Sequence, residues 1–528
     1  MKYMKRNIIQ EVMLNNQLAI TDFENYTSEI AKVTQIEPTG KKAKLVLVTS
    51  MNPTPVGEGK TTTSIGIVDS LNSLGVKTVG CLREPSMGPV FGMKGTGSGS
   101  NNAKLLPFDK INLHFTGDLH AITSANNLIS AVIENEIYQN SDLDIDPNRI
   151  LWQRCEDMND RSLRDTSVNL FNKNKDRVNT CFNITAASDL MALFCLAKSK
   201  EDFRQRINDA IVAYSRSGQP IRVSDLEITE AIMTIISDAL DPNLVRTMED
   251  RPVFVHGGPF ANIAHGCSSV IATNYGLDLA DVVITEAGFG SELGMEKFMD
   301  ITCQQAGWTP NLIVLVVSLK SILHHAKDTG LTGFDAVKYG FDNVKHHINH
   351  CKQYGLNLVI AINHRSEDDL DQLKYLYKLL DDEHVAYALA DTWAYGSKGG
   401  QELAKVILQE INKPVNFTPL YAKEDNLFDK INKICQKAYG SLGPKYSALA
   451  QSKLEEYQNL DGYYVCIAKN PYSLTCDQKI LGRPTNFYTT IEDVEINHAA
   501  KLIIPITTVV FRMPGLPKVP AAKNFVMK

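Results

Sequence analysis

The stretch Leu45-Val46-Leu47-Val48-Thr49 leads through Pro53-Thr54-Pro55-Val56-Gly57-Glu58-Gly59-Lys60 into Thr61-Thr62-Thr63. Its short β-branched run predicts a buried strand, and the glycines that follow let the backbone fold around an anion. Lys60 would bridge terminal phosphate oxygens, and the Thr61 hydroxyl would meet Mg²⁺ where the next helix begins. The stretch therefore predicts a phosphate-binding loop and a protein that handles a nucleoside triphosphate.

This loop departs from the usual spacing G-x-x-x-x-G-K-[ST], which has glycine where Thr54 stands. The alternative interpretation is a Gly/Pro turn that only joins a strand to a helix. The strand, the glycines, Gly-Lys-Thr and a helical pattern over residues 64–74 favour nucleotide binding. The predicted nucleotide-binding residues are Thr54, Pro55, Val56, Gly57, Glu58, Gly59, Lys60 and Thr61.

Composition points to a protein that works on small molecules. The chain has 528 residues and a formal net charge of −6, with acidic and basic residues interspersed. This excludes a broad basic face for nucleic acid and a polybasic segment for anionic lipid. The ten cysteines form no C-x-x-C pair, and the most apolar run, residues 312–319, is too short to span a bilayer. We therefore expect a soluble cytoplasmic protein that binds neither nucleic acid nor membrane.

Strand-like runs alternate with amphipathic segments of helical length, which is typical of an α/β fold with a parallel sheet. These runs are residues 45–49, 78–81, 253–255, 282–285, 312–317 and 358–363. Several end in polar, glycine-bearing turns, and ligands bind at that edge of open parallel sheets. The predicted fold class is α/β, with a P-loop NTPase-like parallel sheet core and smaller α+β domains.

The pattern along the chain predicts three domains. Residues 1–345 would form the nucleotide-binding domain, with an insertion at about 147–250 that reads as mostly helical and charged. Residues 346–440 would form an α/β domain on the side of the second substrate. Residues 441–528 would form a small C-terminal domain, because short strand-like runs there end in a proline-rich segment.

Further candidates carry alternative interpretations. Arg83 follows a strand and could bind a planar oxyanion with two nitrogens, or could form a surface pair with Glu84. The turn His114-Phe115-Thr116-Gly117-Asp118-Leu119-His120 could bind metal, move protons or be structural. Cys267 lacks an activating neighbour in the sequence, which argues against a catalytic thiol. Trp393 could stack on a flat heterocycle or be a core residue.

Taken together, six motifs strongly resemble the formate–tetrahydrofolate ligase family, from about residue 39 to the C-terminus. Such long motifs in the same order are more specific than the phosphate loop alone. They are residues 53–63 (PTPVGEGKTTT), 83–89 (REPSMGP), 111–118 (INLHFTGD), 254–267 (FVHGGPFANIAHGC), 285–290 (TEAGFG) and 513–518 (MPGLPK).

The resemblance implies that ATP, formate and tetrahydrofolate give 10-formyltetrahydrofolate, ADP and phosphate through formyl phosphate. It implies ATP and Mg²⁺, a candidate monovalent cation, and a homotetramer. Lys60 and Arg83 would be catalytic, with Mg²⁺ at Thr61. By similarity at matching positions, the folate would lie against Phe289, Leu389 and Trp393, with Arg365 in the same wall. Asp118 and His114 are candidate proton acceptors for N10 of the folate.

Two departures from the family pattern leave alternatives open. Arg365-Ser366 stands where family members commonly have Phe-Pro, so a guanidinium replaces an apolar ring. The run Gly95-Thr96-Gly97-Ser98-Gly99-Ser100-Asn101 replaces one of alanine and glycine. One alternative is a divergent family member that activates another carboxylate or uses another acceptor. The other is a switch ATPase of the partition or metal-chaperone type, which would need neither Arg83 nor Trp393.

Overall fold

The runs predicted as strands all belong to one large sheet in a computed structural model. The structure describes residues 7–40, 43–55, 57–170, 177–262, 264–507 and 510–525. Within these residues the main sheet has 12 strands. Its path runs through β1 (Ile20–Asn25), β2 (Ala31–Ile36), β14 (Asn243–Thr247), β15 (Pro252–Val255), β4 (Thr78–Leu82), β16 (Val282–Glu286), β3 (Lys44–Ser50), β17 (Leu312–Val317), β18 (Asn357–Asn363) and β19 (Ala386–Ala390).

The centre of the sheet is parallel and one edge is antiparallel. Each neighbouring pair from β15 through β4, β16, β3, β17 and β18 to β19 is parallel. Strands β14, β2 and β1 add to it antiparallel, and a hairpin of β5 (Gly99–Ser100) and β6 (Ala103–Leu106) joins β14. The predicted α/β class is confirmed, and the sheet is mixed rather than purely parallel. Strand β3 is central, so its carboxyl end opens in the middle of the molecule.

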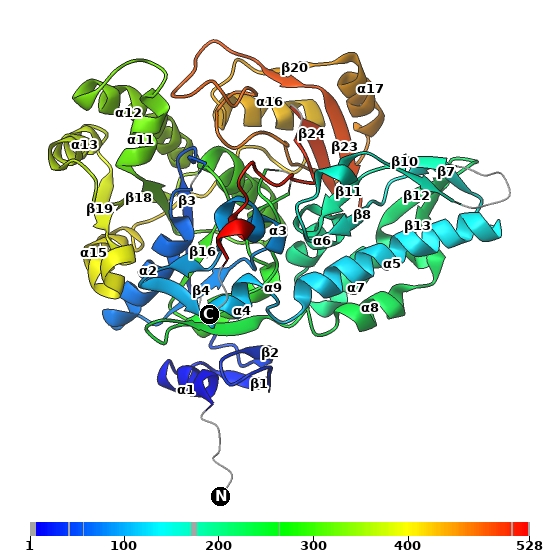
Figure 1. Cartoon of the computed structure of the whole chain (residues 1–528), viewed down its shortest axis with the longest axis horizontal. Helices are drawn as coiled ribbons and strands as arrows, with labels where there is room; N and C mark the ends of the chain where they lie inside the picture. Colours follow the sequence, from blue (N-terminus) through cyan, green and yellow to red (C-terminus); the bar gives the residue numbers. More distant parts are fainter. Residues whose placement is uncertain are drawn as a thin grey trace, which may run out of the picture.

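Alternate residues of the central strands are buried on opposite faces, because successive side chains of a strand point to opposite sides. Leu45 and Leu47 belong to one apolar core, and Val46 and Val48 to another. The first core packs against α9 (Val270–Leu279), α12 (Gly333–Lys352) and α13 (Leu370–Asp382). The second packs against α2 (Lys60–Ser73) and α15 (Gln401–Glu410). Both faces of the sheet are therefore covered (Figure 1).

Residues 145–236 form a mixed layer with its own core, which corrects the expectation of a mostly helical insertion. Helix α5 (Asp118–Gln139) leads into it, and α6 (Asp189–Leu196), α7 (Lys200–Asp209) and α8 (Thr229–Ile236) pack around it. Its strands are β7 (Ile145–Ile150), β8 (Arg154–Glu156), β9 (Thr166–Asn169), β10 (Arg177–Thr180), β11 (Phe182–Ile184), β12 (Ile211–Ser215) and β13 (Pro220–Arg222). These strands pair in small separate sheets, while β14 returns to the main sheet.

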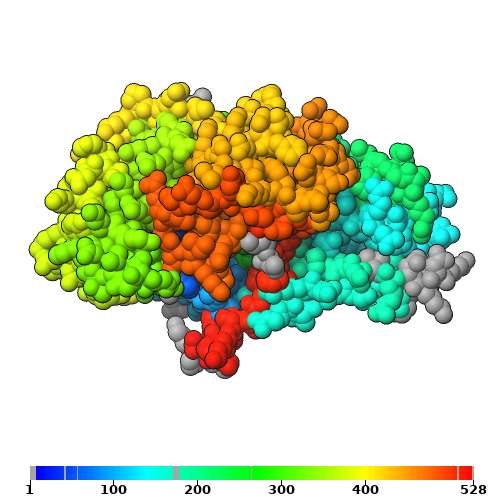
Figure 2. All heavy atoms as spheres, turned by 90° about the horizontal axis from the view of Figure 1, so that it is seen from above, coloured from blue at the N-terminus to red at the C-terminus, as the bar shows by residue number. Residues whose placement is uncertain are grey.

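The C-terminal region packs onto the main sheet. Its elements are α16 (Leu427–Lys437), β20 (Pro444–Tyr446), α17 (Ala448–Tyr457), β21 (Tyr464–Val465), β22 (Thr489–Ile491), β23 (Asp493–Asn497) and β24 (Leu502–Ile506). Buried residues such as Ile431 and Ile503 share a core with β3 and α12. Seen from above, this part covers the middle of the molecule (Figure 2).

Shorter helical turns complete the fold. They are α1 (Ile8–Asn15), α3 (Met87–Pro89), η1 (Val90–Lys94), α4 (Phe108–Asn112), η2 (Arg161–Arg164), η3 (Thr185–Ala187), η4 (Val223–Leu226), η5 (Ser291–Met295), η6 (Phe298–Cys303), α10 (Gln304–Ala306), α11 (Leu319–Ala326), α14 (Thr392–Tyr395), η7 (Gly396–Gly400) and η8 (Ala521–Asn524). Strands β18 and β19 continue the sheet across residue 346, and the three-domain division remains a prediction. Among the described residues, every helix is too short or too polar to cross a bilayer.

Candidate active site

The glycine-rich loop joins β3 to α2 at the carboxyl edge of the sheet. Gly57 and Gly59 have φ angles of 88° and 74°, the left-handed region that glycine adopts without steric cost. A Cβ atom at Gly59 would lie 2.6 Å from Nδ2 of Asn363, which donates to the Glu58 carbonyl at 3.0 Å. Helix α2 begins at Lys60, so its first amides lie directly after the loop. Val56 lies outside the described residues.

Thr54 fits this loop although the usual pattern has glycine there. Thr54 lies outside the left-handed backbone region that the loop glycines occupy. Its carbonyl accepts a hydrogen bond from the Gly57 amide at 3.0 Å. A side chain at this position is therefore compatible with the turn.

The Glu58 carboxylate connects the beginning of the loop to the start of α11. Its Oε1 accepts from the Thr54 amide at 2.7 Å, and its Oε2 accepts from the hydroxyls of Ser318 and Ser321 at the start of α11. The residue is only 2% exposed. This carboxylate therefore holds the shape of the loop rather than facing a substrate.

Asn52 fixes the beginning of the loop to the helices behind it. Its amide donates to Nε2 of His347 at 3.1 Å, and its Nδ2 donates to Oε1 of Glu292 at 2.6 Å. Its carbonyl accepts from Nε2 of His325 at 3.2 Å. Burial lowers the pKa of His325 to about 4, so this imidazole is neutral at pH 7.

Lys60 points back toward the end of β3. Its Nζ donates to Oγ of Ser50 at 3.1 Å, and that hydroxyl donates to the Phe289 carbonyl at 3.1 Å. Phe289 follows β16 and has a φ of 59°, which is uncommon for a bulky residue. The phosphate loop and the turn after β16 are thus joined through one serine.

Glu286, the last residue of β16, joins two predicted site residues. Its carboxylate accepts from the Thr61 hydroxyl at 3.1 and 2.9 Å, and lies 3.8 Å from a guanidinium nitrogen of Arg83. Arg83 also donates to the Pro259 carbonyl at 3.1 Å. Its partners are therefore Glu286 and Pro259, and the alternative of a surface pair with Glu84 is wrong, because Glu84 is buried.

Three cations gather at this edge. Burial lowers the pKa of Lys60 to about 8, against the opposing effect of Glu286 and Glu58. The pKa of Lys94, at the end of η1, is lowered to about 8 by desolvation and by Arg83 and Lys60. Desolvation is the larger cause, and the charges of Arg83 and Lys60 add to it. Crowded cations of this kind bind an anion that relieves their mutual repulsion.

The predicted ring-binding residues follow strands farther along the same edge. Leu389 lies in β19, and Trp393 follows in α14 with 52% of its surface exposed. The alternative of a core tryptophan is therefore wrong. Arg365 follows β18, where its amide donates to Asp368 at 2.9 Å and its guanidinium lies 3.9 Å from Glu367. The carboxyl ends of parallel strands thus place all three near one edge.

The histidine-bearing turn does not form a catalytic cluster. Asp118 is buried, with Lys32 Nζ at 2.8 Å and Asn243 Nδ2 at 2.6 Å, so it is a structural ion pair and a poor choice of base for N10. His114 and His120 are exposed. Across the described residues no group of three or more His, Cys, Asp or Glu side chains is arranged to hold a metal.

Cys267 is not a nucleophile. Its thiol is buried against the Thr302 hydroxyl at 3.4 Å. Burial raises the pKa of Cys267 to about 11, so the thiolate is scarce at neutral pH. All ten cysteines are free thiols in the structure.

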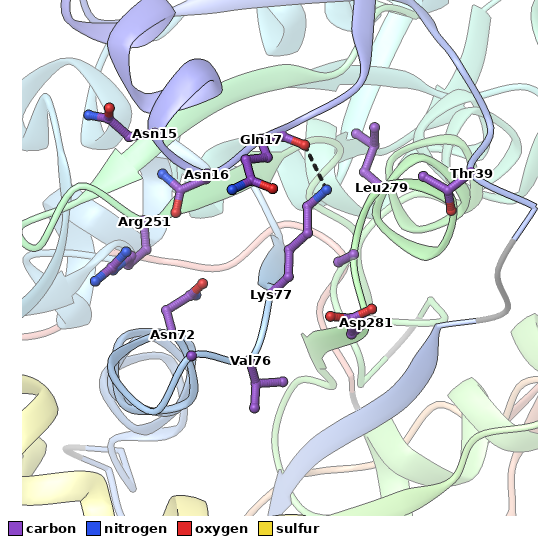
Figure 3. Close-up of a pocket in the computed structure, with 12 residues that line it drawn as sticks. Asn15, Asn16, Gln17, Thr39, Asn72, Val76, Lys77, Arg251, Leu279 and Asp281 are labelled. Atoms are coloured by element: carbon purple, nitrogen blue, oxygen red, sulfur yellow. Dashed lines mark hydrogen bonds between the residues drawn. The ribbon is translucent and has the colours of Figure 1, made fainter.

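A cavity of about 450 Å³ lies at the opposite edge of the sheet (Figure 3). Lys77, Arg251 and Asp281 line it, and each directly precedes a strand. In Figure 3 the Lys77 amine is bonded to the Gln17 carbonyl, at 2.7 Å. The glycine-rich loop and the cations near it are at the carboxyl edge, so this cavity is separate from them.

Comparison with known proteins agrees with this arrangement. The model of the family described as formate–tetrahydrofolate ligase matches residues 2–528. The chain belongs to the formate–tetrahydrofolate ligase family. It is 54% identical over 526 residues to the formate–tetrahydrofolate ligase of Ureaplasma parvum serovar 3, covering 99% of each chain. It is 49% identical over 497 residues to that of Malacoplasma penetrans, covering 92% of each chain.

A relative from a third genus is similar over almost the same length. The formate–tetrahydrofolate ligase of Staphylococcus aureus strain NCTC 8325 is 43% identical over 513 residues, which covers 96% of this chain and 92% of the relative. The family resemblance predicted from the motifs is therefore confirmed.

Sequence reasoning about this ligase family member missed three site residues. Glu286 lies inside a motif that was recognised for its glycines, and an acidic residue at the end of a parallel strand was the available signal. Lys94 is the cation of a glycine-spaced loop that seemed weak evidence in isolation. Ser50 ends a strand and carries no pattern of its own, so nothing local marked it.

Proposed function

We propose that this chain ligates formate to tetrahydrofolate with ATP, giving 10-formyltetrahydrofolate, ADP and phosphate. A formate oxygen attacks the γ-phosphorus and ADP leaves, which forms formyl phosphate. The N10 amine then attacks the formyl carbon, phosphate leaves with the bridging oxygen, and N10 loses its proton. Activation is needed because an unactivated carboxylate has no good leaving group. The convergence of Lys60 and Arg83 around Glu286 is the observation that best supports this order of steps.

The cations provide what phosphoryl transfer requires. Its transition state spreads negative charge over the phosphoryl oxygens, and fixed positive groups stabilise that charge. Lys60 is placed at the helix start to bind the terminal phosphate, and Arg83 is held by Pro259 so that its fork can bind a planar oxyanion. In this proposal β3, the loop and α2 act as a P-loop NTPase-like core.

Thr61 and Glu286 fit a magnesium ion that arrives with the nucleotide. Mg²⁺ prefers hard oxygen ligands and is usually held by one or two protein groups together with phosphates and water. The Thr61 hydroxyl and the Glu286 carboxylate already lie together at 2.9 Å. Bound there, the ion would neutralise part of the phosphate charge.

For the folate we propose a wall of Phe289, Leu389, Trp393 and Arg365. The exposed Trp393 offers a face for stacking, and the Arg365 guanidinium could lie flat on a pterin or pair with a glutamyl carboxylate. We further propose that the protein is a cytoplasmic homotetramer. We also propose that its activity depends on a monovalent cation, and we assign no residues to that cation.

Isotopic labelling tests the reaction. Purified chain is incubated with ¹⁸O-labelled formate, ATP, Mg²⁺ and tetrahydrofolate, and the products are analysed by mass spectrometry. We expect one ¹⁸O in each phosphate released and one formyl-folate for each ADP. Unlabelled phosphate would contradict formyl phosphate as the intermediate. Absence of formyl-folate would contradict the ligase.

The same assay separates the alternatives. Omitting formate should stop ADP release, whereas a switch ATPase would continue to hydrolyse ATP. A family member with another acceptor would release ADP at the same rate with and without tetrahydrofolate. We expect tetrahydrofolate to be required for rapid turnover.

A further inference from the structure

We propose that Asn101 and Asn102 are positioning residues for the folate, because they hold the backbone that carries Trp393. Both lie at the tip of the β5–β6 hairpin, and Asn101 ends the run of residues 95–101 in which the family resemblance implies alanine and glycine. The inference rests on the proposed function, in which Trp393 is a wall for the folate ring. It assigns a role to residues whose polarity otherwise suggested a changed substrate.

The hairpin tip is bonded to the Trp393 backbone from two residues. Asn101 Nδ2 donates to the Trp393 carbonyl at 2.8 Å, and the Asn102 amide donates to the same oxygen at 3.4 Å. Asn102 Nδ2 donates to the next carbonyl, of Ala394, at 2.7 Å. These hydrogen bonds join segments 292 residues apart in the sequence. They therefore fix the position of α14 relative to the hairpin and do not stabilise a local turn.

Asn101 is suited to this place by its backbone. Its φ is 50°, in the left-handed region that asparagine tolerates better than most residues with a side chain. Glycine at this position could adopt the same left-handed backbone but has no side-chain amide. The asparagine therefore adds a donor to Trp393 without changing the path of the hairpin.

The other polar residues of the loop are directed inward. Asn112 Oδ1 accepts from the Gly97 amide at 2.7 Å, and Asn112 Nδ2 donates to the Ser98 hydroxyl at 2.5 Å. Ser100 Oγ lies 3.3 Å from Oγ1 of Thr62, in the first turn of α2. The run at residues 95–101 is thus attached to α2. Its polar side chains bond to other groups of the protein.

The Trp393 ring depends on such backbone anchors. Among the described residues no aromatic or cationic group contacts this ring, and 52% of the residue is exposed. Its neighbour Thr392 is buried against α2, where Gly66 leaves room for it. The backbone on one side of Trp393 is therefore held by α2, and the carbonyl on the other side by the hairpin.

Steady-state kinetics of the full-length enzyme test the proposal. Asn101→Gly keeps the left-handed backbone and removes the donor to Trp393. We expect KM for tetrahydrofolate to rise about 3- to 10-fold, the range for one ordinary hydrogen bond, with kcat and KM for ATP unchanged. The matched control is Asn140→Gly, because Asn140 is exposed, ends α5 and has a φ of 59°. That control should leave all three constants unchanged.

Time-resolved fluorescence anisotropy supplies a readout without activity. The chain has three tryptophans, and the signal of Trp393 is obtained as the difference from Trp393→Phe. Asn101→Gly should increase the amplitude of fast motion in this signal. Unchanged motion together with unchanged KM for tetrahydrofolate would overturn the proposal, as would an equal rise in KM for ATP.

A wrong role for the hairpin and a wrong proposed function give different results. If wild type forms formyl-folate and Trp393→Leu raises KM for tetrahydrofolate, while Asn101→Gly does not, only the role of the hairpin is wrong. If wild type forms no formyl-folate, the proposed function itself is wrong, and the anisotropy still decides whether the hairpin restrains Trp393.

Discussion

Glu286 is the carboxylate among the cations of the proposed phosphate site. It accepts from Thr61 and faces Arg83, while Lys60 is bonded to the nearby Ser50. In the proposed function, a triphosphate would compete with this carboxylate for the same cations. Burial lowers the pKa of Lys60 to about 8, and the charges of Glu286 and Glu58 oppose this shift.

Replacing Lys60 by alanine should remove most of the turnover. The Lys60→Ala variant loses a fixed charge next to the transferred phosphoryl group, and kcat/KM for ATP should fall at least about 10²- to 10³-fold. The measurement is ADP release with formate and tetrahydrofolate, with circular dichroism to check folding. Lys405→Ala is the control, because Lys405 is exposed and its amine donates to Glu402 at 2.6 Å. A folded Lys60→Ala variant with wild-type rates would contradict the phosphate-loop assignment.

Replacing Arg83 should slow the reaction even when the new residue is lysine. Lysine keeps the charge but loses the planar fork, so Arg83→Lys should slow formyl phosphate formation about 10²-fold. Single-turnover quench with labelled ATP measures this step directly. The matched control is Arg204→Lys. Arg204 lies on α7 and forms an ion pair with Glu230 of α8 at the surface. If the two variants are equally fast, Arg83 takes no part in the transfer.

At the scale of elements, the features that depend on residues close together in the sequence could be predicted. The strand at residues 45–49, the loop glycines and Lys60 are contiguous, and the structure has them as predicted. Glu286 could not be placed, because its contact with Thr61 depends on the pairing of β16 with β3 across more than 200 residues. The layer at residues 145–236 was misread as mostly helical because its strands are short and, among the described residues, pair with one another in small sheets.

The contact of α2 with α14 is an element-scale test of how the folate wall is held. A Cβ at Gly66 would overlap the Thr392 side chain, so Gly66→Ala should destabilise the protein by about 1–3 kcal/mol despite its better helix propensity. Thermal unfolding measures this, and KM for tetrahydrofolate should rise because Trp393 moves with Thr392. Adding Thr392→Ala should recover part of the stability, and full additivity of the two changes would contradict a direct clash.

At the scale of the whole molecule, buried carboxyl groups make stability depend on pH. Burial raises the pKa of Asp69 on α2 to about 8, and the hydrogen bond from Thr247 and the charge of Arg251 oppose this, while Glu249 adds to it. Between pH 3.8 and about 8 the folded state therefore keeps a proton that the unfolded chain releases. The contribution of Asp69 to stability therefore falls as pH rises through this window and levels off above it.

Asp69→Asn should weaken this pH dependence. The amide oxygen can still accept from the Thr247 hydroxyl, which lies 2.5 Å from Oδ1, but the side chain no longer has a proton to lose. We expect the Tm of wild type, measured relative to that of the variant, to fall by up to a few degrees as the pH rises from 6.5 to about 8.5. Glu292, whose pKa burial raises to about 7, keeps part of the slope in both. Asp342→Asn, at an exposed site on α12, should follow the wild-type curve. A variant curve parallel to wild type would mean that Asp69 is already ionised at pH 6.5.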